Sequence, residues 1–149
     1  MKITSKADYA LHAMLYVASI NGKHAATISE IAEAESIPRE YLAKILKELV
    51  GKRILKSKRG IMGGYFLTKP RIDYTFLEII EAIDGPINPA GCTKPENKRT
   101  GHRKGKCAAF AYFDDLRRKI EGDLSAINLN DIPYERYYQV GRGNGSARK

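Results

Sequence analysis

The sequence contains no long uninterrupted run of apolar residues. Nowhere does such a run approach the roughly 18 residues that a membrane-spanning helix requires. The first ten residues also lack the basic segment followed by an apolar segment that is typical of a secretory signal peptide. We therefore expect a cytoplasmic protein with no membrane partner.

Cysteine is scarce, with two residues in 149. In a reducing cytoplasm, Cys92 and Cys107 are not expected to form a structural disulfide, which leaves free thiols, metal ligands or redox-active groups. The closely spaced cysteine pairs of structural zinc sites are absent, so a zinc site is the weaker metal alternative.

Motifs that carry catalysis are also missing. The sequence shows no nucleophile and base constellation, phosphate-binding loop or cofactor fingerprint, and the Gly63-Gly64 turn is too short to count as one. No internal repeat is visible. The sequence thus favours a protein that is not an enzyme.

Positive charge, by contrast, is abundant. The chain carries 26 lysines and arginines against 17 aspartates and glutamates, a formal net charge of +9. This balance favours a polyanionic partner, with nucleic acid ahead of a membrane surface. The hydrophobic content of 43% is sufficient for a globular core.

Apolar residues recur every three or four positions in the segments 5–19, 27–35 and 38–51, which predicts three amphipathic helices. Ser5 is the expected cap of the first helix, and Thr27 begins a capping box in the second. The third helix is expected to start after a proline and to end at a glycine cap.

A β-hairpin and a fourth helix are expected next. Residues 54–57 and 65–67 are typical of strands, and the glycine-rich segment 59–64 joins them. A capping box at Thr75 starts a helix that stops at Gly85. The predicted fold is mainly α with a small β-hairpin wing, a winged helix-turn-helix followed by a long C-terminal dimerisation helix.

Composition divides the chain into four parts. Residues 1–85 form the expected winged helix-turn-helix DNA-binding domain, and residues 86–106 a basic cysteine loop with six positive side chains and one negative. Residues 107–132 contain an apolar stripe that one small domain would not fully cover, which predicts a dimerisation helix. Residues 133–149 are polar and are predicted to be a mobile basic tail.

The segment from Arg39 to Arg59 has eight basic and two acidic residues. A charge run alone is usually an ordinary solvated surface, but here it coincides with a predicted recognition helix and wing. The predicted DNA-binding residues are Arg39, Glu40, Tyr41, Lys44, Lys47, Lys52, Lys58, Arg59, Gly63 and Gly64. Arg39 and Glu40 are expected to read base edges, the later lysines to contact phosphates, and Arg59 to enter a minor groove.

Several segments are similar to one family of proteins. The stretches SKADYAL at 5–11, RGIMGGYFL at 59–67 and EIIEAIDGP at 78–86 closely resemble the Rrf2 family of bacterial transcription regulators, and the resemblance runs from Met1 to about Ile132. It implies a homodimer that binds double-stranded DNA and, in many members, an iron-sulfur sensor.

Family members with a cluster commonly carry three cysteines in this loop, whereas this chain has only Cys92 and Cys107. Histidine is able to replace cysteine on one iron. Asp8 and His12, four residues apart, project from one side of a helix. They resemble a variant in which an acidic residue and a histidine of one subunit join two cysteines of the other. That resemblance implies a [2Fe-2S] cluster held by Asp8, His12, Cys92 and Cys107.

Alternatives remain at each of these positions. His102, five residues before Cys107, competes with His12 as the nitrogen ligand. Asp8 is also explained by the dipole of its helix, and His12 by a place at an interface. Without metal, the two cysteines would sense oxidants by thiol chemistry. Candidate signals are redox state, nitric oxide and iron-sulfur supply. His24 is assigned no role.

Overall fold

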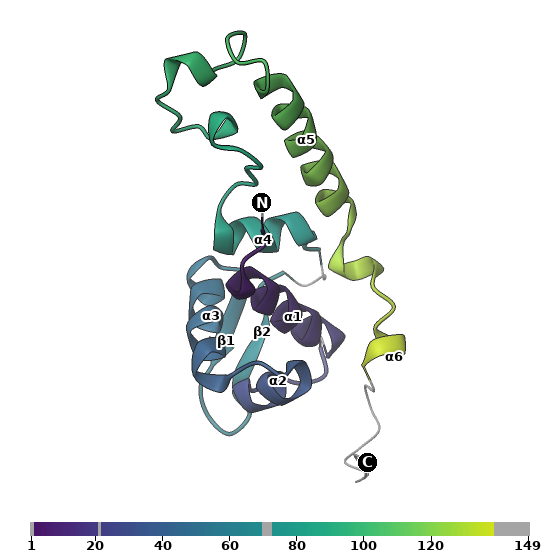
Figure 1. Ribbon diagram of the computed structural model, residues 1–149. Coiled ribbons are helices and arrows are strands. Elements are labelled where there is room, and N and C mark those ends of the chain that lie inside the picture. The colour runs from purple at the N-terminus through teal and green to yellow at the C-terminus, as the bar shows by residue number, and fades with distance from the viewer. Residues whose placement is uncertain (1, 21, 70–72, 139–149) are drawn as a thin grey trace.

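The computed structural model describes residues 2–20, 22–69 and 73–138 (Figure 1). Its helices are α1 (Ser5–Ser19), α2 (Ile28–Glu35), α3 (Arg39–Gly51), α4 (Phe76–Asp84), α5 (Phe110–Ala126) and α6 (Tyr134–Tyr137). Its strands are β1 (Leu55–Lys58) and β2 (Gly64–Leu67), and short 3-10 helices lie at Gly91–Thr93, Thr100–His102 and Leu129–Asp131. The prediction of a mainly helical chain with a small β-hairpin is confirmed.

Threonine hydroxyls cap the N-termini of α1, α2 and α4. The capping boxes predicted at Thr27 and Thr75 are both present, since each hydroxyl accepts a hydrogen bond from the backbone N–H three residues on. The cap of α1 is Thr4 and not the predicted Ser5. The Thr4 hydroxyl accepts a 3.1 Å hydrogen bond from the backbone N–H of Ala7.

Residues in the left-handed conformation set the turns on either side of α3. Ser36, between α2 and α3, has φ of 53°, and the following Ile37 is buried. At the other end, the predicted glycine cap is wrong. Gly51 lies inside the helix, and the residue with positive φ is Arg53, at 60°.

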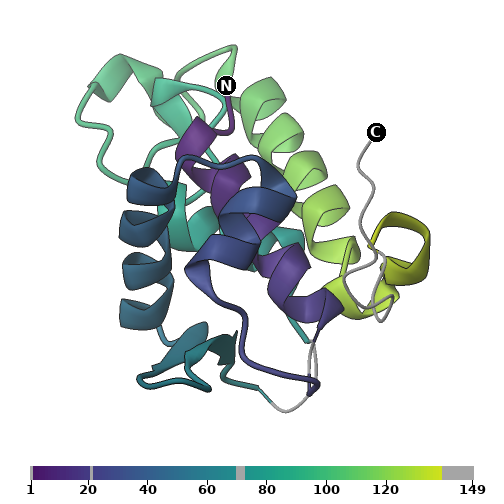
Figure 2. The same cartoon turned by 90° about the horizontal axis from the view of Figure 1, so that it is seen from below.

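The core of the N-terminal domain is built around α1, which packs against α2, α3 and α4 (Figures 1 and 2). Ala10 and Ala13 of α1 are fully buried, and their small side chains let the neighbouring helices approach closely. Leu42 and Leu46 of α3 and Ile79 of α4 are fully buried in the same core. Helix α3 therefore packs on the same hydrophobic core as α1.

The wing is a two-stranded antiparallel hairpin. Leu55 lies opposite Leu67, and both side chains are buried against the helices. Ala26, just before α2, exchanges two backbone hydrogen bonds of 2.8 Å with Tyr65. This short third pairing fastens the wing to the helix-turn-helix.

Helix α5 extends away from the domain and is covered only in part by its own chain. Its residues Ile120 and Leu124 pack with Ile80 and Ile87, which belong to α4 and to the loop behind it. Phe113 and Leu116 are 37% and 43% exposed, and no residue of α5 is buried. Part of the apolar stripe is thus left exposed. Figures 1 and 2 show α5 along one side of the molecule.

Residues 134–138, at the start of the predicted mobile tail, make contacts that their polar composition did not predict. The Tyr138 hydroxyl donates a 2.6 Å hydrogen bond to Glu35, and its ring meets that of Tyr16 edge to face at 6.1 Å. The Tyr134 hydroxyl donates to the backbone carbonyl of Leu129. The segment is polar in composition, but its tyrosine rings still provide apolar contacts. The remainder of the predicted tail, 139–149, lies outside the described residues.

Candidate DNA-binding surface and cluster site

The exposed face of α3 carries most of the predicted base-reading side chains. Arg39, Glu40, Lys44 and Lys47 are all exposed, because the opposite face of the helix is committed to the core. Arg39 is the first residue of the helix, so it stands at the end that leads into a major groove in helix-turn-helix proteins.

Tyr41 differs from its neighbours on α3. Its ring packs edge to face on that of Tyr9 of α1, with centroids 5.7 Å apart and an interplanar angle of 77°. The side chain is half-buried. The structure therefore places part of Tyr41 against α1 and leaves the rest of its side chain accessible.

Two predicted phosphate contacts, Lys52 and Lys58, and the predicted minor-groove residue Arg59 lie on the surface. Lys52, Lys58 and Arg59 are exposed, the first just after α3 and the others on the wing. Among the described residues, no ion pair occupies these side chains or those of Arg39 and Lys44. Their charges are therefore free to meet a polyanion.

The fold itself requires the two glycines of the wing, apart from their predicted place on DNA, which stays a prediction. A Cβ on Gly63 would lie 2.2 Å from the carbonyl oxygen of Lys58, and one on Gly64 would lie 2.6 Å from that of Ala26. Gly64 also has φ of +152°. Both glycines are needed because the chain's own backbone fills the space, whatever approaches from outside.

Asp8 and His12 lie side by side on α1, as their spacing predicts. His12 Nε2 is 3.5 Å from an Asp8 carboxylate oxygen, and His12 Nδ1 is 3.2 Å from a Glu35 carboxylate oxygen. The Asp8 and His12 side chains are 56% and 46% exposed, whereas that of Glu35 is only 10% exposed. Glu35 was missed from the sequence, because its position at the end of α2 gives no sign of this contact.

Asn97 joins two parts of the cysteine loop. The Asn97 side-chain amide donates to the backbone carbonyls of Cys92, at 3.3 Å, and His102, at 2.9 Å. His102 Nδ1 lies 3.9 Å from Cys107 Sγ. Both cysteines are half-buried free thiols. The competing ligand His102 is thus close to one cysteine within the same subunit.

A solvent-open cavity of about 730 Å³ adjoins Cys107 at the start of α5. Its lining includes the side chains of Lys104, Lys106, Phe110 and Arg118. The thiol of Cys107 therefore has access to small molecules next to cationic groups.

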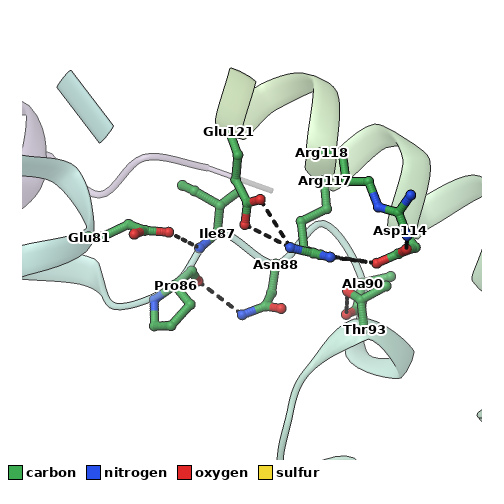
Figure 3. Close-up of polar contacts among 10 residues, drawn as sticks. All are labelled: Glu81, Pro86, Ile87, Asn88, Ala90, Thr93, Asp114, Arg117, Arg118 and Glu121. Atoms are coloured by element: carbon green, nitrogen blue, oxygen red, sulfur yellow. Dashed lines mark hydrogen bonds and ion pairs between the residues drawn. The ribbon is translucent and has the colours of Figure 1, made fainter. Parts of the chain in front are cut away.

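Arg117 of α5 lies near the first residues of the loop (Figure 3), and its ion pairs are with residues of its own helix. Its guanidinium donates to Asp114 at 2.7 Å and to Glu121 at 2.9 Å, and Arg118 also donates to Asp114. Hydrogen bonding to Arg117 lowers the pKa of Asp114. Glu81 of α4 accepts a hydrogen bond from the backbone N–H of Ile87 and so fixes the start of the loop.

Within the part of the chain that the structure describes, no group of three or more histidine, cysteine, aspartate or glutamate side chains is arranged to hold a metal ion. Asp8 and His12 are on α1, whereas the cysteines belong to the loop beyond α4 (Figure 1). The two regions are linked mechanically, because the backbone N–H and the hydroxyl of Thr4 both donate to the Asp84 carboxylate. The start of α1 is thereby tied to the residue that precedes the turn into the loop.

The family model and the individual proteins that this chain resembles are all transcriptional regulators. Residues 3–135 match the Rrf2 family, described as an iron-dependent transcriptional regulator. The HTH-type transcriptional regulators IscR of Photorhabdus laumondii and Klebsiella pneumoniae are 33% and 30% identical over 132 residues, which are 89% of this chain and 79% of each relative.

Solved structures show the same fold. The global cysteine regulator CymR of B. subtilis matches with a TM-score of 0.70 at 26% identity, covering 88% of this chain and 95% of that one. IscR of T. potens matches with a TM-score of 0.72 at 22% identity, covering 97% and 94%. No described helix is both long and apolar enough to cross a membrane. With the family matched over nearly the whole described chain, this protein belongs to the Rrf2 family of transcription regulators and is not an enzyme.

Proposed function

We propose that this regulator binds double-stranded DNA as a homodimer and that a [2Fe-2S] cluster shared between subunits controls its affinity for the operator. The observation that carries the proposal is the Asp8 and His12 pair, whose side chains lie 3.5 Å apart at the surface of α1. The family's description as iron-dependent supports it.

The side chains present fit such a cluster. Two cysteines, one histidine and one aspartate provide four protein ligands of the types that bind iron. All four reach the surface at least in part, so a second subunit has access to them. When bound, the cluster would supply a charge that changes with its oxidation state.

The DNA contacts proposed here follow from exposure and charge. Arg39, Glu40 and Lys44 would face the major groove from the exposed side of α3. Lys47, Lys52 and Lys58 would contact phosphates, and Arg59 would reach into a minor groove from the wing. In a two-fold dimer, the two recognition helices would lie about one DNA turn, roughly 34 Å, apart.

Direct contacts lead from the proposed cluster site to the helix-turn-helix. His12 contacts Glu35, the last residue of α2, and the turn at Ser36 follows directly. A change at His12 therefore has a route of direct contacts to the helix-turn-helix. Regulation requires that the cluster stabilise one relative orientation of the two helix-turn-helix domains more than another.

A metal-free thiol sensor is the second candidate. It is favoured by the cavity beside Cys107 and by the 3.9 Å approach of His102 to its sulfur. In this alternative an oxidant would modify a thiol directly, and Asp8 and His12 would have no part in sensing.

Anaerobic purification distinguishes the candidates. We expect a visible spectrum of an iron-sulfur centre for the wild type and for His24→Ala, whose histidine is exposed and away from the site. We expect its loss in His12→Ala and Cys92→Ser and its retention in His102→Ala. A colourless wild type with redox-dependent DNA affinity would establish the thiol sensor, and loss in His102→Ala with retention in His12→Ala would overturn the assignment of His12.

Sharing between subunits is tested by mixed dimers. Consider a heterodimer of one His12→Ala chain and one Cys92→Ser chain. In a shared arrangement, one site keeps all four native ligands, and the other site lacks both His12 and Cys92. An arrangement within one subunit leaves both sites damaged. Recovery of about half of the wild-type cluster content in isolated heterodimers is therefore expected, and no recovery would contradict sharing.

A further inference from the structure

The tip of the wing exposes two bulky apolar side chains. Ile61 is 103% exposed and Met62 is 78% exposed. Ile61 is more exposed than any other large hydrophobic residue that the structure describes. Exposed apolar side chains of this size are favoured to become buried against a partner.

The tip that carries them is rigid. The backbone N–H of Gly63 donates to the carbonyl of Gly60 at 3.0 Å, and Gly60 has φ of +107°. Gly63 is in such close contact with Lys58 that no Cβ fits there. Behind the tip, the bonds between Ala26 and Tyr65 anchor β2. The two side chains are therefore held out from the domain on a stiff support.

Charge around the tip indicates the partner. Lys58 and Arg59 lead directly into it, both exposed and, within the described chain, without an ion pair. A second copy of the same tip would be repelled by these charges. A polyanion with an apolar interior is complementary to both features, and DNA is such a partner, with phosphates outside and stacked bases within.

The position of the tip agrees with this partner. β1 follows α3 after a short turn, so the wing and the recognition helix belong to one continuous basic segment. Figures 1 and 2 both show the hairpin turn at the edge of the molecule, remote from α5. The open stripe of α5 is thus left free for a dimer while the wing reaches DNA.

We propose that Ile61 and Met62 form an apolar wedge that enters the minor groove beside Arg59 and deforms a base step there. The inference rests on the proposed DNA binding and extends it to the source of sequence preference. Pyrimidine-purine steps such as TA and CA unstack most easily, so the wedge would favour operators with such a step under the wing.

The test uses duplexes that wild-type protein selects from a random pool. The variants are Ile61→Ala, Met62→Ala and the double replacement, and the control is Tyr137→Ala, which removes a side chain of 72% exposure away from the wing. We expect the double variant to bind roughly tenfold or more weakly and to bend DNA less in an energy-transfer assay. The salt dependence of the double variant should stay unchanged, whereas Lys58→Ala, which removes a proposed phosphate contact, should reduce the salt slope by about one.

Other outcomes separate the two proposals. If the wild type selects no duplex, DNA binding itself fails. If the wild type selects duplexes and the double variant binds and bends them as the wild type does, the wedge is overturned while DNA binding stands. Binding to anionic vesicles that depends on Ile61 and Met62, with unchanged DNA affinity, would overturn the wedge in favour of a lipid surface.

Discussion

The Glu35 carboxylate lies 3.2 Å from Nδ1 of His12, although 23 residues separate the two in the chain. The other oxygen of the same carboxylate accepts a 2.6 Å hydrogen bond from Tyr138. One partly buried side chain at the end of α2 thus joins α1 to the segment that follows α5. A carboxylate on one ring nitrogen fixes the orientation of a histidine and favours coordination through the other, here Nε2.

Glu35→Gln should weaken the cluster without removing a ligand. Outer-shell partners of this kind typically contribute 10- to 100-fold to metal affinity, so we expect faster cluster loss in an anaerobic chelator challenge followed by absorbance. The difference in DNA affinity between cluster-bound and cluster-free protein should also shrink. Glu135→Gln, an exposed change on α6, is the control. Equal rates of loss in Glu35→Gln, Glu135→Gln and wild type would show that Glu35 does not support the site.

Tyr138→Phe should lower the free energy of unfolding by an amount that depends on pH. Burial, followed by the contact with Glu35, raises the pKa of Tyr138 above its ordinary value. The folded chain therefore keeps this proton after the unfolded chain loses it, so the stabilisation is complete below about pH 10 and falls as pH rises further. Near neutral pH the replacement should cost about 1–2 kcal/mol for one hydrogen bond to a carboxylate.

Urea unfolding at several pH values measures this effect. The difference in unfolding free energy between wild type and Tyr138→Phe should narrow from pH 8 to pH 11, since only the wild type has the hydroxyl that ionises on unfolding. Tyr134, whose pKa burial also raises, is present in both proteins and cancels from the comparison. A difference that stays constant over this range would contradict the assigned environment of Tyr138.

Local signals explain why the sequence predicted much of the fold. A capping box and an amphipathic period involve residues within one or two turns, and Thr27 and Thr75 therefore start their helices where expected. The misplaced cap at Ser5 has the same origin, because adjacent hydroxyl residues are equivalent in pattern and only the bond from Ala7 selects Thr4.

Tertiary contacts explain most of what the sequence did not predict. The partners of Glu35 lie 23 and 103 residues away, and no local pattern connects them. The edge-to-face contact between Tyr41 and Tyr9 joins α3 to α1, and no local pattern predicts it. The DNA contact expected of Tyr41 stays a prediction. The assignment of Asp8, His12 and the cysteines to one shared cluster stays a prediction, because it depends on a second subunit.

Gly63→Ala and Gly122→Ala should have opposite effects on stability. A Cβ at Gly63 would meet backbone atoms at 2.2 and 2.8 Å, so the hairpin turn must open, at a cost of about 2 kcal/mol or more. Gly122 lies within α5 with nothing near its Cβ position, so alanine there should stabilise by about 0.5–1 kcal/mol. Thermal unfolding of both variants is the measurement. A Gly63→Ala protein as stable as wild type would show that the tip is not the stiff support inferred for Ile61 and Met62.

Leu116→Asp should dissociate the proposed dimer. Leu116 and Phe113 are the exposed part of the α5 stripe, whereas Leu124 is covered within its own chain. A charge buried in an apolar interface without a partner is strongly unfavourable, so we expect dimer affinity to fall roughly 100-fold or more and operator affinity to fall with it, because the paired recognition helices separate. Sedimentation velocity over a concentration series measures the first effect. Ser125→Asp adds the same charge to an exposed position of the same helix and should leave the dimer intact. If both variants sediment as the wild type does, the open stripe of α5 is not the dimer interface, and the shared cluster site loses its structural basis.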